Sequence, residues 1–458
     1  MKFLINTKIG LNRGNKRLWL EGVRLARCGF NVGTNISVDT TGDKLTIKRD
    51  ANADKIVSKR KKREEYLPII EVTGSKLDAY DIGEQVRVLI TPKGIIVSRT
   101  TSDTAKKEML SELVDRVKQG KPLRVCSLFH GGGVLDSAVH DGMSNAGIKS
   151  KIALAVECES AYLDASLNNN PHLFDENSVV IESKVQYVNS NASDRYDIGV
   201  MGIPCTGASI AGKSKNKLSA AEQHAEAGTM FHYALNFALK APIVLIENVV
   251  EYEKTLSFTV IRSVLEEQGY KVQTKVLNGN EFGAFENRNR LCAVAMLDEL
   301  ADLFDINDIV PDVNNQISVL SDLMDDVPQD STRWKTFQYL IDKEERDKAA
   351  GKGFGRTLLD ENSTSCGVVG RLYHKCRSSE PYIKASFDDV LTRLFTPNEH
   401  ARIKTIPSRL INGVSDTIAH EILGQSIIYK AFVKAAEIIG ETVSNFTNSK
   451  FTFGKLAA

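Results

Sequence analysis

The sequence predicts an α/β protein with a mostly parallel, doubly wound sheet and a small all-β domain near the start of the chain. From Leu123 onward, short apolar segments alternate with helical stretches, as in sheets covered by helices on both faces. Residues 1–100 instead contain short β-branched segments bounded by Gly and Asp, which are typical of small strands joined by turns. At 458 residues the chain is long enough for roughly two to four domains.

Changes in this pattern divide the chain into five segments. Residues 298–330 contain ten acidic residues and no Lys or Arg, whereas 333–384 are basic and rich in Gly. We expect a small β domain over 1–100, a helical linker over 101–122, the α/β core over 123–297, an irregular region over 298–390, and a helical part over 391–458 that completes the core.

The overall composition excludes several classes of protein. Hydrophobic residues make up 42% and charged residues 26%, and the net charge of +1 leaves only local basic patches to contact nucleic acid. The seven cysteines show no CxxC or Cys/His ligand spacing, which argues against a structural metal site and a disulfide framework. No apolar segment reaches the roughly 18 residues of a membrane span, and no signal-peptide core is present. We therefore expect a cytoplasmic protein with no metal and no membrane partner.

Residues 1–100 carry a weak internal repeat. Gly33 and Gly83 lie 50 positions apart (83 − 33), and the same offset relates Phe30 to Tyr80 and several apolar pairs that follow. Each half has an aromatic residue, a glycine and two short strands, and such half-repeats often form one pseudo-symmetric barrel. The arrangement resembles the AbrB/SymE-like swapped-hairpin domains, many of which bind DNA as dimers. The resemblance implies DNA binding or dimerisation, so a homodimer through this domain is one expected assembly.

Five consecutive basic residues, Lys59 to Arg63, lie between the two halves. One interpretation is a solvated linker, because charged runs are most often solvent-exposed. The other is a contact with nucleic-acid phosphates, which adds salt-sensitive affinity without reading the base sequence. The sequence alone leaves both interpretations open.

A glycine-rich segment follows the first predicted strand of the core. Phe129, Gly131 and Gly133 lie here, and glycine allows a sharp turn and a close approach to a ligand. Glu157 ends the next strand, where an acidic residue commonly accepts hydrogen bonds from ribose hydroxyls. No Gly-Lys-Ser/Thr follows the glycines, so a P-loop is not expected. The pair indicates a nucleoside-containing cofactor, with a packing turn and a surface carboxylate as the alternative.

Chemically reactive side chains follow two further predicted strands. Cys205 comes after a proline beyond one strand, and Glu247 and Asn248 end another. The carboxyl ends of parallel strands meet at one edge of a sheet, which would bring the thiol and the carboxyl beside the glycine turn. Arg288 and Arg290 precede a later strand and alternate onto one face, where buried arginines need an anionic partner.

The order of these motifs resembles that of the DNA cytosine-5 methyltransferases. The glycine turn, the acidic strand end, Pro-Cys, Glu-Asn-Val and Arg-x-Arg follow one another as in that family, and the resemblance covers about 123–439. Two later segments, 393–399 and 424–428, also match family motifs. The resemblance implies a Rossmann-like class I methyltransferase fold, S-adenosylmethionine as cofactor and double-stranded DNA as substrate. It also implies a target-recognition role for 298–390 and a place in restriction-modification.

The resemblance further implies catalytic roles. Cys205 would add to C6 of a flipped-out cytosine, which makes C5 nucleophilic toward a methyl group. Glu247 would hold N3 while protonated, and Asn248 would hold the loop or the base. Arg288 and Arg290 would orient the base and the Cys205 loop and would balance the charge of Glu247.

The implied cofactor site draws on several strand ends. The glycine turn and the acidic strand end supply most of it, and the motif that usually reads the adenine ring is placed at Glu182 or Ser183. The residues implied to bind the cofactor are Phe129, His130, Gly131, Gly133, Glu157, Cys158, Glu182, Ser183, Pro204, Gln425 and Ser426.

Several positions depart from the common pattern of the family. Val134 stands in place of a glycine and Thr206 in place of a glutamine, while Glu286 and Gln425 replace a glutamine and an asparagine. The proposed nucleophile, its neighbouring glutamate and both arginines are retained. We therefore expect an active enzyme.

Basic side chains in the second part of the recognition region are the expected DNA contacts, namely Lys352, Arg356, Arg371, Lys375 and Arg377. The acidic part should avoid a DNA backbone and lie on an outer surface. Two alternatives stay open at this level. One is a catalytically weak relative that regulates or protects DNA through residues 1–100, and the other is an RNA cytosine-5 methyltransferase.

Overall fold

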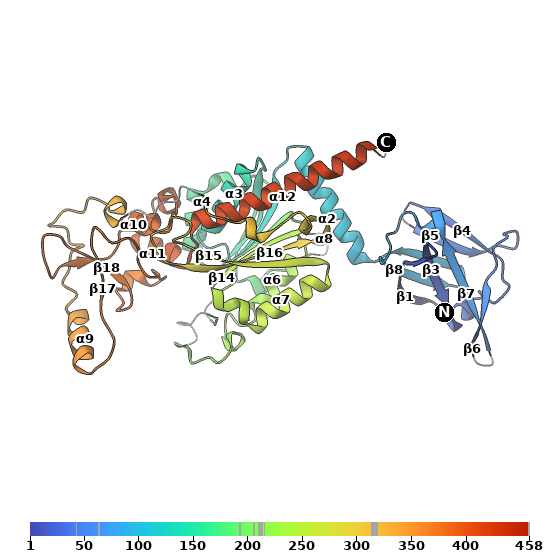
Figure 1. The fold of residues 1–458 in the computed structure, drawn as a ribbon, viewed down its shortest axis with the longest axis horizontal. Helices are drawn as coiled ribbons and strands as arrows, with labels where there is room; N and C mark the ends of the chain where they lie inside the picture. Colours follow the sequence, from blue (N-terminus) through green and yellow to red (C-terminus); the bar gives the residue numbers. More distant parts are fainter. Residues whose placement is uncertain are drawn as a thin grey trace. The chain divides into compact units, whose positions relative to one another are not determined.

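The fold is described from a computed structural model, in which the described residues are 1–42, 44–62, 65–191, 194–204, 207–208, 214, 216–312 and 319–456. The chain forms two compact units, Met1–Glu108 and Met109–Ala458, and each is described by itself (Figure 1). In the described part of the chain, no helix is long and apolar enough to cross a membrane.

The first unit consists of two antiparallel sheets that share one apolar core. The five-stranded sheet has the order β1 (Phe3–Lys8), β8 (Gln85–Thr91), β9 (Gly94–Arg99), β5 (Lys44–Arg49) and β4 (Ile36–Thr41). The four-stranded sheet has the order β2 (Gly10–Asn12), β3 (Asn15–Glu21), β7 (Glu65–Thr73) and β6 (Ser58–Lys62). A short helix, α1 (Val23–Arg27), and a 3-10 turn at Gly74–Leu77 follow β3 and β7. The expected all-β character of this part is confirmed.

The two halves of the repeat complete each other by exchanging strands. β3 and β7, which begin 50 residues apart (65 − 15), pair with one another, and β5 of the first half pairs with β9 of the second. β1 pairs with β8 across the halves, and Asn35 bridges Ile56 in the corresponding place. Phe30 and Tyr80 are both buried in the common core. Neither half could therefore bury its apolar face alone.

The second unit is built on a seven-stranded sheet. Its strand order is β12 (Val179–Glu182), β11 (Ser150–Glu157), β10 (Leu123–Leu128), β13 (Ile198–Met201), β14 (Ile243–Asn248), β16 (Asn289–Leu297) and β15 (Tyr270–Asn278). The first five strands are parallel, and β16 runs antiparallel to both of its neighbours. The predicted mostly parallel sheet is confirmed.

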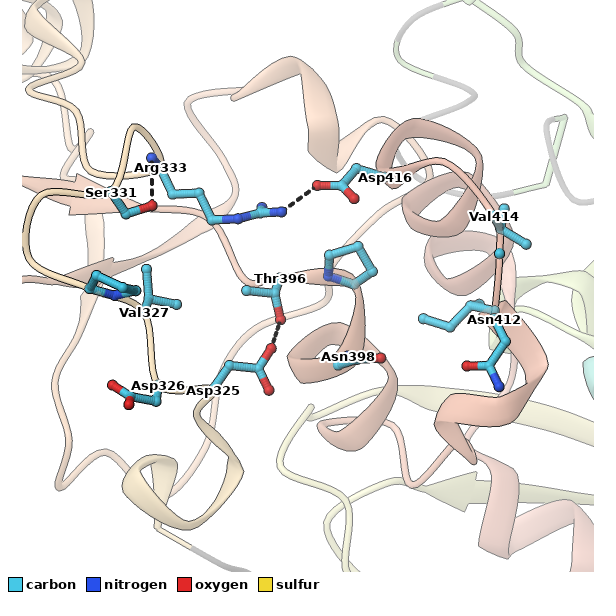
Figure 2. Close-up of a pocket in the computed structure, with 14 residues that line it drawn as sticks. Asp325, Asp326, Val327, Ser331, Arg333, Thr396, Asn398, Asn412, Val414 and Asp416 are labelled. Atoms are coloured by element: carbon cyan, nitrogen blue, oxygen red, sulfur yellow. Dashed lines mark hydrogen bonds and ion pairs between the residues drawn. The ribbon is translucent and has the colours of Figure 1, made fainter.

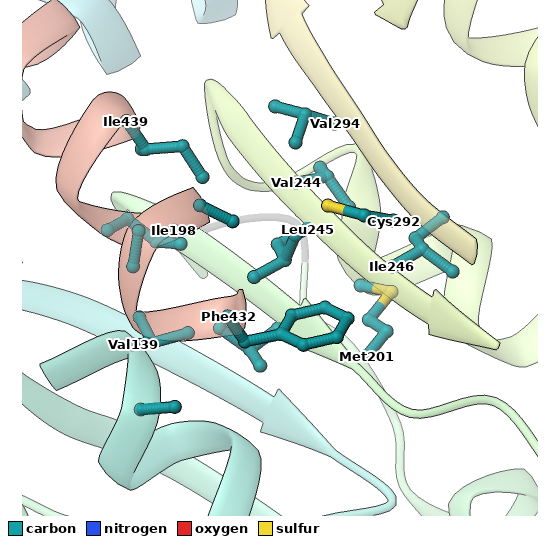
Figure 3. Close-up of a cluster of buried hydrophobic side chains, with 14 of the residues drawn as sticks. Val139, Ile198, Met201, Val244, Leu245, Ile246, Cys292, Val294, Phe432 and Ile439 are labelled. Carbon is teal, nitrogen blue, oxygen red and sulfur yellow. The ribbon is translucent and has the colours of Figure 1, made fainter. Parts of the chain in front are cut away.

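Helices cover both faces of this sheet. Figure 1 shows α3 (Val134–Asn145), α4 (Ser160–Asn169) and α12 (Tyr429–Leu456) on one face and α6 (Met230–Ala238) and α7 (Leu256–Glu267) on the other. Phe432 and Ile439 of α12 lie over Leu245 and Ile198 of the sheet, beside Val139 of α3 (Figure 3). Burial on both faces explains why the strands read as continuous apolar segments.

A buried carboxylate anchors the helix that precedes β10 to the sheet. Asp197, immediately before β13, is fully buried and accepts hydrogen bonds from the backbone N–H of Arg124 at 2.7 Å and from its guanidinium at 3.0 Å. Arg116 of α2 (Thr101–Lys118) lies 3.3 Å from the same carboxylate. Charges buried in this way are stable only when they are paired, so α2 is fixed against β10 and β13.

The region that follows β16, up to and including α11, has a small core of its own. It contains α8 (Asp298–Ala301), α9 (Gln338–Ala349), the three-stranded sheet β17 (Thr357–Leu359), β18 (Pro381–Lys384) and β19 (Thr392–Arg393), then α10 (Pro397–Arg402) and α11 (Asp416–Gln425). Phe285, Tyr373 and Phe395 are buried together here.

Further 3-10 turns of the second unit lie at Pro171–Leu173, Val185–Tyr187, Ala221–Gln223, Val250–Lys254, Ile306–Asp308, Leu320–Leu323, Tyr373–Lys375 and Ser408–Ile411.

The close approach of α3 and α12 gives a test of this packing. A Cβ added to Gly142 of α3 would overlap the Val433 carbonyl oxygen of α12. We expect Gly142→Ala to lower the free energy of unfolding by about 1–3 kcal/mol, because backbone cannot yield as a side chain can. Gly367→Ala, where the added Cβ meets open space, should change it by less than about 0.5 kcal/mol. Urea unfolding measures both, and equal losses would contradict the contact.

Candidate active site

The turn after β10 requires glycine. Phe129, Gly131 and Gly133 have φ values of 57°, 57° and 73°, which lie in the left-handed region. A Cβ at Gly133 would collide with Ser166 of α4, whereas a Cβ at Gly131 would meet nothing within 4 Å. The turn therefore packs tightly on the helix side and has open space at Gly131.

His130 serves the fold through its side chain. Its ring is buried, with Nδ1 2.9 Å from the Ser127 hydroxyl and 2.8 Å from the Asp136 carboxylate. Nε2 lies 2.7 Å from the Ser166 hydroxyl. The ring holds the glycine turn to α3 and α4, so a cofactor contact of His130 would have to come from its backbone.

Glu157 anchors the same turn from β11. Its Oε2 accepts the N–H of Gly131 at 2.7 Å, and its Oε1 accepts the N–H groups of Cys158 and Glu159 at 2.8 and 2.9 Å. A carboxylate offers about four acceptor positions, so these three bonds leave about one, on Oε2, for a ribose hydroxyl. The carboxylate both shapes the turn and can accept from a ligand there.

The next strand ends beside it. Glu182 lies opposite Glu157 in the parallel register and is exposed, and the Ser183 N–H donates to the Glu157 carbonyl oxygen at 2.8 Å. Burial and the neighbouring Glu157 carboxylate raise the pKa of Cys158 to about 11, which keeps this exposed thiol protonated at neutral pH. The glycine turn, the Glu157 carboxylate and the exposed Glu182 side chain together fit a nucleoside-containing cofactor.

The loop after β13 leads to the predicted nucleophile. Cys205 and Thr206 lie outside the described residues, but the chain is described up to Pro204. The side chain of Asn248, which is 1% exposed, donates to the Ile203 carbonyl oxygen at 3.0 Å, and its own oxygen accepts the Val249 N–H at 2.9 Å. Asn248 therefore fixes the backbone two residues before Cys205.

Glu247 and Arg290 form an ion pair at the same edge of the sheet. Arg290 Nε lies 2.8 Å from Glu247 Oε1, and both side chains are 12% exposed. β16 runs antiparallel to β14, so its first residues lie where β14 ends. Burial raises the pKa of Glu247 overall, although Arg290 and Arg288 oppose the shift. A carboxyl group of this kind is suited to hold a proton at a higher pH than an exposed glutamate.

Arg288 has a different set of partners. Its guanidinium lies 3.3 Å from Glu286 and donates to the Gly424 carbonyl oxygen of α11 at 3.1 Å. Glu286 also accepts the Val369 N–H at 2.8 Å and pairs with Lys404, and both members of that pair are fully buried. The cluster joins the start of β16 to the recognition region and to the C-terminal part of the fold.

The two charges of this cluster influence each other strongly. Burial alone would raise the pKa of Glu286, but Lys404 and Arg288 lower it overall. Burial and then Arg288 lower the pKa of Lys404 to about 7, while Glu286 acts in the opposite direction. Glu286 is one of the departures from the family pattern, and the buried Lys404 is its counter-charge.

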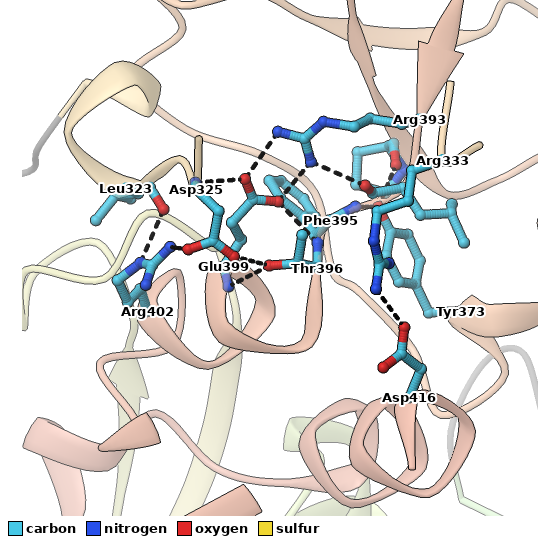
Figure 4. Close-up of polar contacts among 12 residues, drawn as sticks. Leu323, Asp325, Arg333, Tyr373, Arg393, Phe395, Thr396, Glu399, Arg402 and Asp416 are labelled. Atoms are coloured by element: carbon cyan, nitrogen blue, oxygen red, sulfur yellow. Dashed lines mark hydrogen bonds and ion pairs between the residues drawn. The ribbon is translucent and has the colours of Figure 1, made fainter. Parts of the chain in front are cut away.

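A second buried ion pair connects β19 to α10. Arg393 contacts Glu399 through two nitrogens at 2.6 and 2.8 Å, and both side chains are fully buried (Figure 4). Glu399 also accepts the N–H of Thr396, whose hydroxyl caps the start of α10 at 3.1 Å. Asp325 of the acidic segment contacts Thr396 and Arg402, so that segment is partly tied into the fold.

The basic residues expected to contact DNA differ in their surroundings. Arg356 is held by Glu344 at 2.7 Å, and Lys352 lies 3.8 Å from Asp347. Arg371 is exposed, 3.8 Å from Glu421 and stacked on the Tyr162 ring of α4. Lys375 and Arg377 are exposed and form no ion pair with a described residue.

A polar cavity of about 470 Å³ lies apart from these groups (Figure 2). It is lined by the acidic segment, the start of α10 and the loop before α11, including Asp325, Arg333, Thr396 and Asp416. Arg333 and Asp416 form an ion pair of 2.7 Å at its wall. None of the predicted catalytic or cofactor residues lines it.

Gln425 is the last residue of α11, the helix that also carries Gly424, and Ser426 follows it. Gln425 is exposed at the end of α11, and the Ser426 N–H donates to the Leu423 carbonyl oxygen at 3.2 Å. Gly424 itself lies so close to Gly370 that an added Cβ would overlap its backbone. The segment therefore packs on the recognition region, next to Arg371.

Three of the residues that hold these groups together were not singled out from the sequence. The structure places Tyr162 on α4, Glu421 on α11 and Lys404 in the turn after α10, and Tyr162 donates to Glu421 at 2.7 Å. Their importance comes from partners more than a hundred positions away. Glu286 was noted only as a departure from the family pattern, and its burial, which requires a cationic partner, comes from the structure.

The family model of the C-5 cytosine-specific DNA methylases matches residues 123–444. The chain belongs to this family. The match includes the seven-stranded sheet, the recognition region and α10 to most of α12, and it leaves residues 1–122 outside. The expected class I methyltransferase fold of the second unit is confirmed.

Curated relatives of this DNA methylase are type II methyltransferases. M.NlaX of Neisseria lactamica is 28% identical over 265 residues, which cover 56% of this chain and 79% of that protein. M.MspI of Moraxella sp is 28% identical over 270 residues, which cover 57% of this chain and 60% of that protein. The chain thus spans about four fifths of the first relative and three fifths of the second.

Two solved structures show the same fold. The Dnmt2 methyltransferase of S. pombe superposes with a TM-score of 0.54 over 69% of this chain and 98% of that one, at 19% identity. The Entamoeba histolytica methyltransferase EhMeth gives a TM-score of 0.52 over 70% and 98%, at 17% identity. The likeness concerns the architecture of the sheet and its helices.

The Glu286–Lys404 pair yields a stability test. Lys404→Met removes a cation and leaves the buried Glu286 carboxylate with Arg288 as its remaining cationic partner. We expect a loss of about 3 kcal/mol in the free energy of unfolding. Combining it with Glu286→Gln removes the uncompensated charge, so the double variant should regain part of the loss. Urea unfolding of the four proteins measures the coupling, and strictly additive losses would contradict it.

Proposed function

We propose that the enzyme transfers a methyl group from S-adenosylmethionine to C5 of cytosine in double-stranded DNA through a covalent Cys205 adduct. The ion pair of Glu247 with Arg290, beside the Asn248-anchored loop that leads to Cys205, carries this proposal. Family membership supports the reaction class, and the glycine turn with Glu157 supports the cofactor.

The chemistry begins with the thiol. Cytosine C5 is a poor nucleophile, and addition of the Cys205 thiolate to C6 turns the ring into an enamine that can attack from C5. The bound cofactor supplies an electrophilic methyl group. A base then removes the C5 proton, β-elimination re-forms the C5–C6 double bond, and the Cys205 thiolate leaves.

Glu247 would stabilise the charge that develops on the cytosine ring. Negative charge moves toward N3 as the thiolate adds, and a protonated carboxyl that donates to N3 stabilises this state. The raised pKa of Glu247 favours the protonated form that this step needs. Arg290 positions the carboxyl, and Asn248 positions the backbone that precedes the nucleophile.

The cofactor and the backbone of the DNA would be held by different segments of the unit. Phe129, Gly131, Glu157 and Glu182 would face the nucleoside part of the cofactor. The target base must leave the duplex to reach Cys205, at a cost of about a few kcal/mol. Exposed cations of the recognition region, such as Lys375 and Arg377, would contact the backbone of the DNA.

Removal of the nucleophile tests the reaction. We expect Cys205→Ala to abolish the transfer of labelled methyl groups from S-adenosylmethionine to cytosine-containing duplex DNA, because no adduct can form. Cys28→Ala in the first unit, outside the family match, should retain activity. Methylcytosine sequencing of DNA from a host that expresses the chain would identify the target, with an empty vector as control. Transfer by the Cys205 variant, or transfer to tRNA alone, would contradict the proposal.

The pH dependence of turnover tests the role of Glu247. Turnover should fall as the pH rises through the raised pKa of Glu247, because the protonated acid is lost. Arg290 favours the carboxylate, so Arg290→Gln should raise this pKa further and move the fall in kcat to higher pH, along with a lower maximal rate. A shift to lower pH, or no pH-dependent fall in the parent enzyme, would remove Glu247 from this role.

A further inference from the structure

The two units carry opposite net charges. Residues 1–108 contain 22 Lys and Arg and 13 Asp and Glu, a net charge of +9 (22 − 13). The remaining residues contain 37 Lys and Arg (59 − 22) and 45 Asp and Glu (58 − 13), a net charge of −8 (37 − 45). The near-neutral total is thus the sum of a strongly basic first unit and an acidic second unit. Of the two units, only the first carries a net positive charge, which attracts DNA at a distance.

Part of this basic charge lies on a two-stranded ribbon. β6 pairs with Glu65–Ile69 of β7, whereas β3 pairs with the later part of β7, from Ile69 to Thr73. β6 is also the edge strand of its sheet. The hairpin therefore extends past the last residue of β3 without a third strand, as Figure 1 shows. A two-stranded ribbon of this kind is one of the elements that a DNA major groove, about 12 Å wide, admits.

Basic side chains lie on both faces of the ribbon, and Glu65 lies opposite Lys62 on one of them. Lys59, Arg60, Lys61 and Lys62 are all exposed, and they alternate between the faces as strand residues do. Lys59 and Lys61 share a face with Tyr66, which is 56% exposed, and the Lys59 ammonium lies 4.8 Å from the centre of that ring. The Tyr66 ring and two cations thus form one accessible surface.

Most of these cations are free to meet an external anion. Arg60 pairs with Glu21 at 3.0 Å, and this exposed contact contributes little stability. Lys61 and Lys62 form no ion pair with a described residue. Lysines on an edge strand also prevent sheet-to-sheet aggregation, which is the competing explanation for their presence.

We propose that the β6–β7 ribbon binds duplex DNA through its phosphates, independently of the methylation target. The charge of the unit, the two-stranded form of the ribbon and the accessible lysines beside Tyr66 point to this ligand. The linked unit would raise the local concentration of DNA at the catalytic unit, because the two share one chain. The proposal concerns a different unit from the proposed function and does not require the Cys205 chemistry.

The test measures binding of the full chain to a duplex of A·T pairs, which contains no cytosine. We expect Lys59→Ala, Lys61→Ala and Lys62→Ala in one chain to weaken binding about tenfold or more. Each lost phosphate contact should make the slope of log K against log salt about 0.9 less negative. The matched control combines Lys8→Ala, Lys44→Ala and Lys93→Ala, which removes the same charge from exposed positions on the other sheet and its β8–β9 turn. The control should weaken binding less than about threefold and leave the slope nearly unchanged.

Several outcomes would overturn the proposal. Equal effects of the two triple variants would assign the affinity to net charge alone. An unchanged affinity in the ribbon variant would leave prevention of sheet-to-sheet aggregation as the role of these lysines. Tighter ribbon-dependent binding to RNA than to duplex DNA would replace the ligand. Thermal unfolding checks that the variants are folded. Cys205→Ala should bind the A·T duplex like the parent, so loss of methylation and loss of ribbon binding can be told apart.

Discussion

The parallel register of five strands is the constraint on which the site depends. One row of paired residues crosses the sheet at its carboxyl edge, namely Ile181, Val156, Leu128, Met201 and Ile246. Each proposed cofactor or catalytic group on these strands follows that row within a few residues. β16 runs the other way, so its beginning brings Arg288 and Arg290 back to the same edge. A slip of one residue in any strand would turn these side chains away.

This constraint explains what could be predicted from sequence. Apolar segments and their end residues were sufficient to place Glu157, Glu247 and Asn248 at one edge, because strand order follows from a small set of topologies. The orientation of His130 could not be predicted, because its partners come from α3 and α4. The Lys404 pair was equally hidden, since it joins residues 118 positions apart (404 − 286). Side-chain partners across such separations depend on packing, not on local pattern.

The buried charges have a consequence for how recognition and chemistry are related. Glu286 contacts Val369 of the recognition region and Lys404 beyond α10, while Arg288 contacts the end of α11. The residues just before β16 are therefore held by three segments that are distant in sequence. Two residues after Arg288, within β16, Arg290 holds Glu247. A shift of any of these three segments would thus act on the strand that positions Glu247.

The exchange of strands in the first unit also bears on how the protein is made. β1 pairs with β8, with Phe3 opposite Ile90, so during synthesis β1 must wait for most of the unit before it finds its partner. Such long-range pairing slows folding and leaves an apolar strand exposed meanwhile. The seven-stranded sheet begins only at Leu123, after the last strand of this unit. Synthesis from the N-terminus therefore allows the two sheets of this unit to form before the seven-stranded sheet exists to compete for their strands.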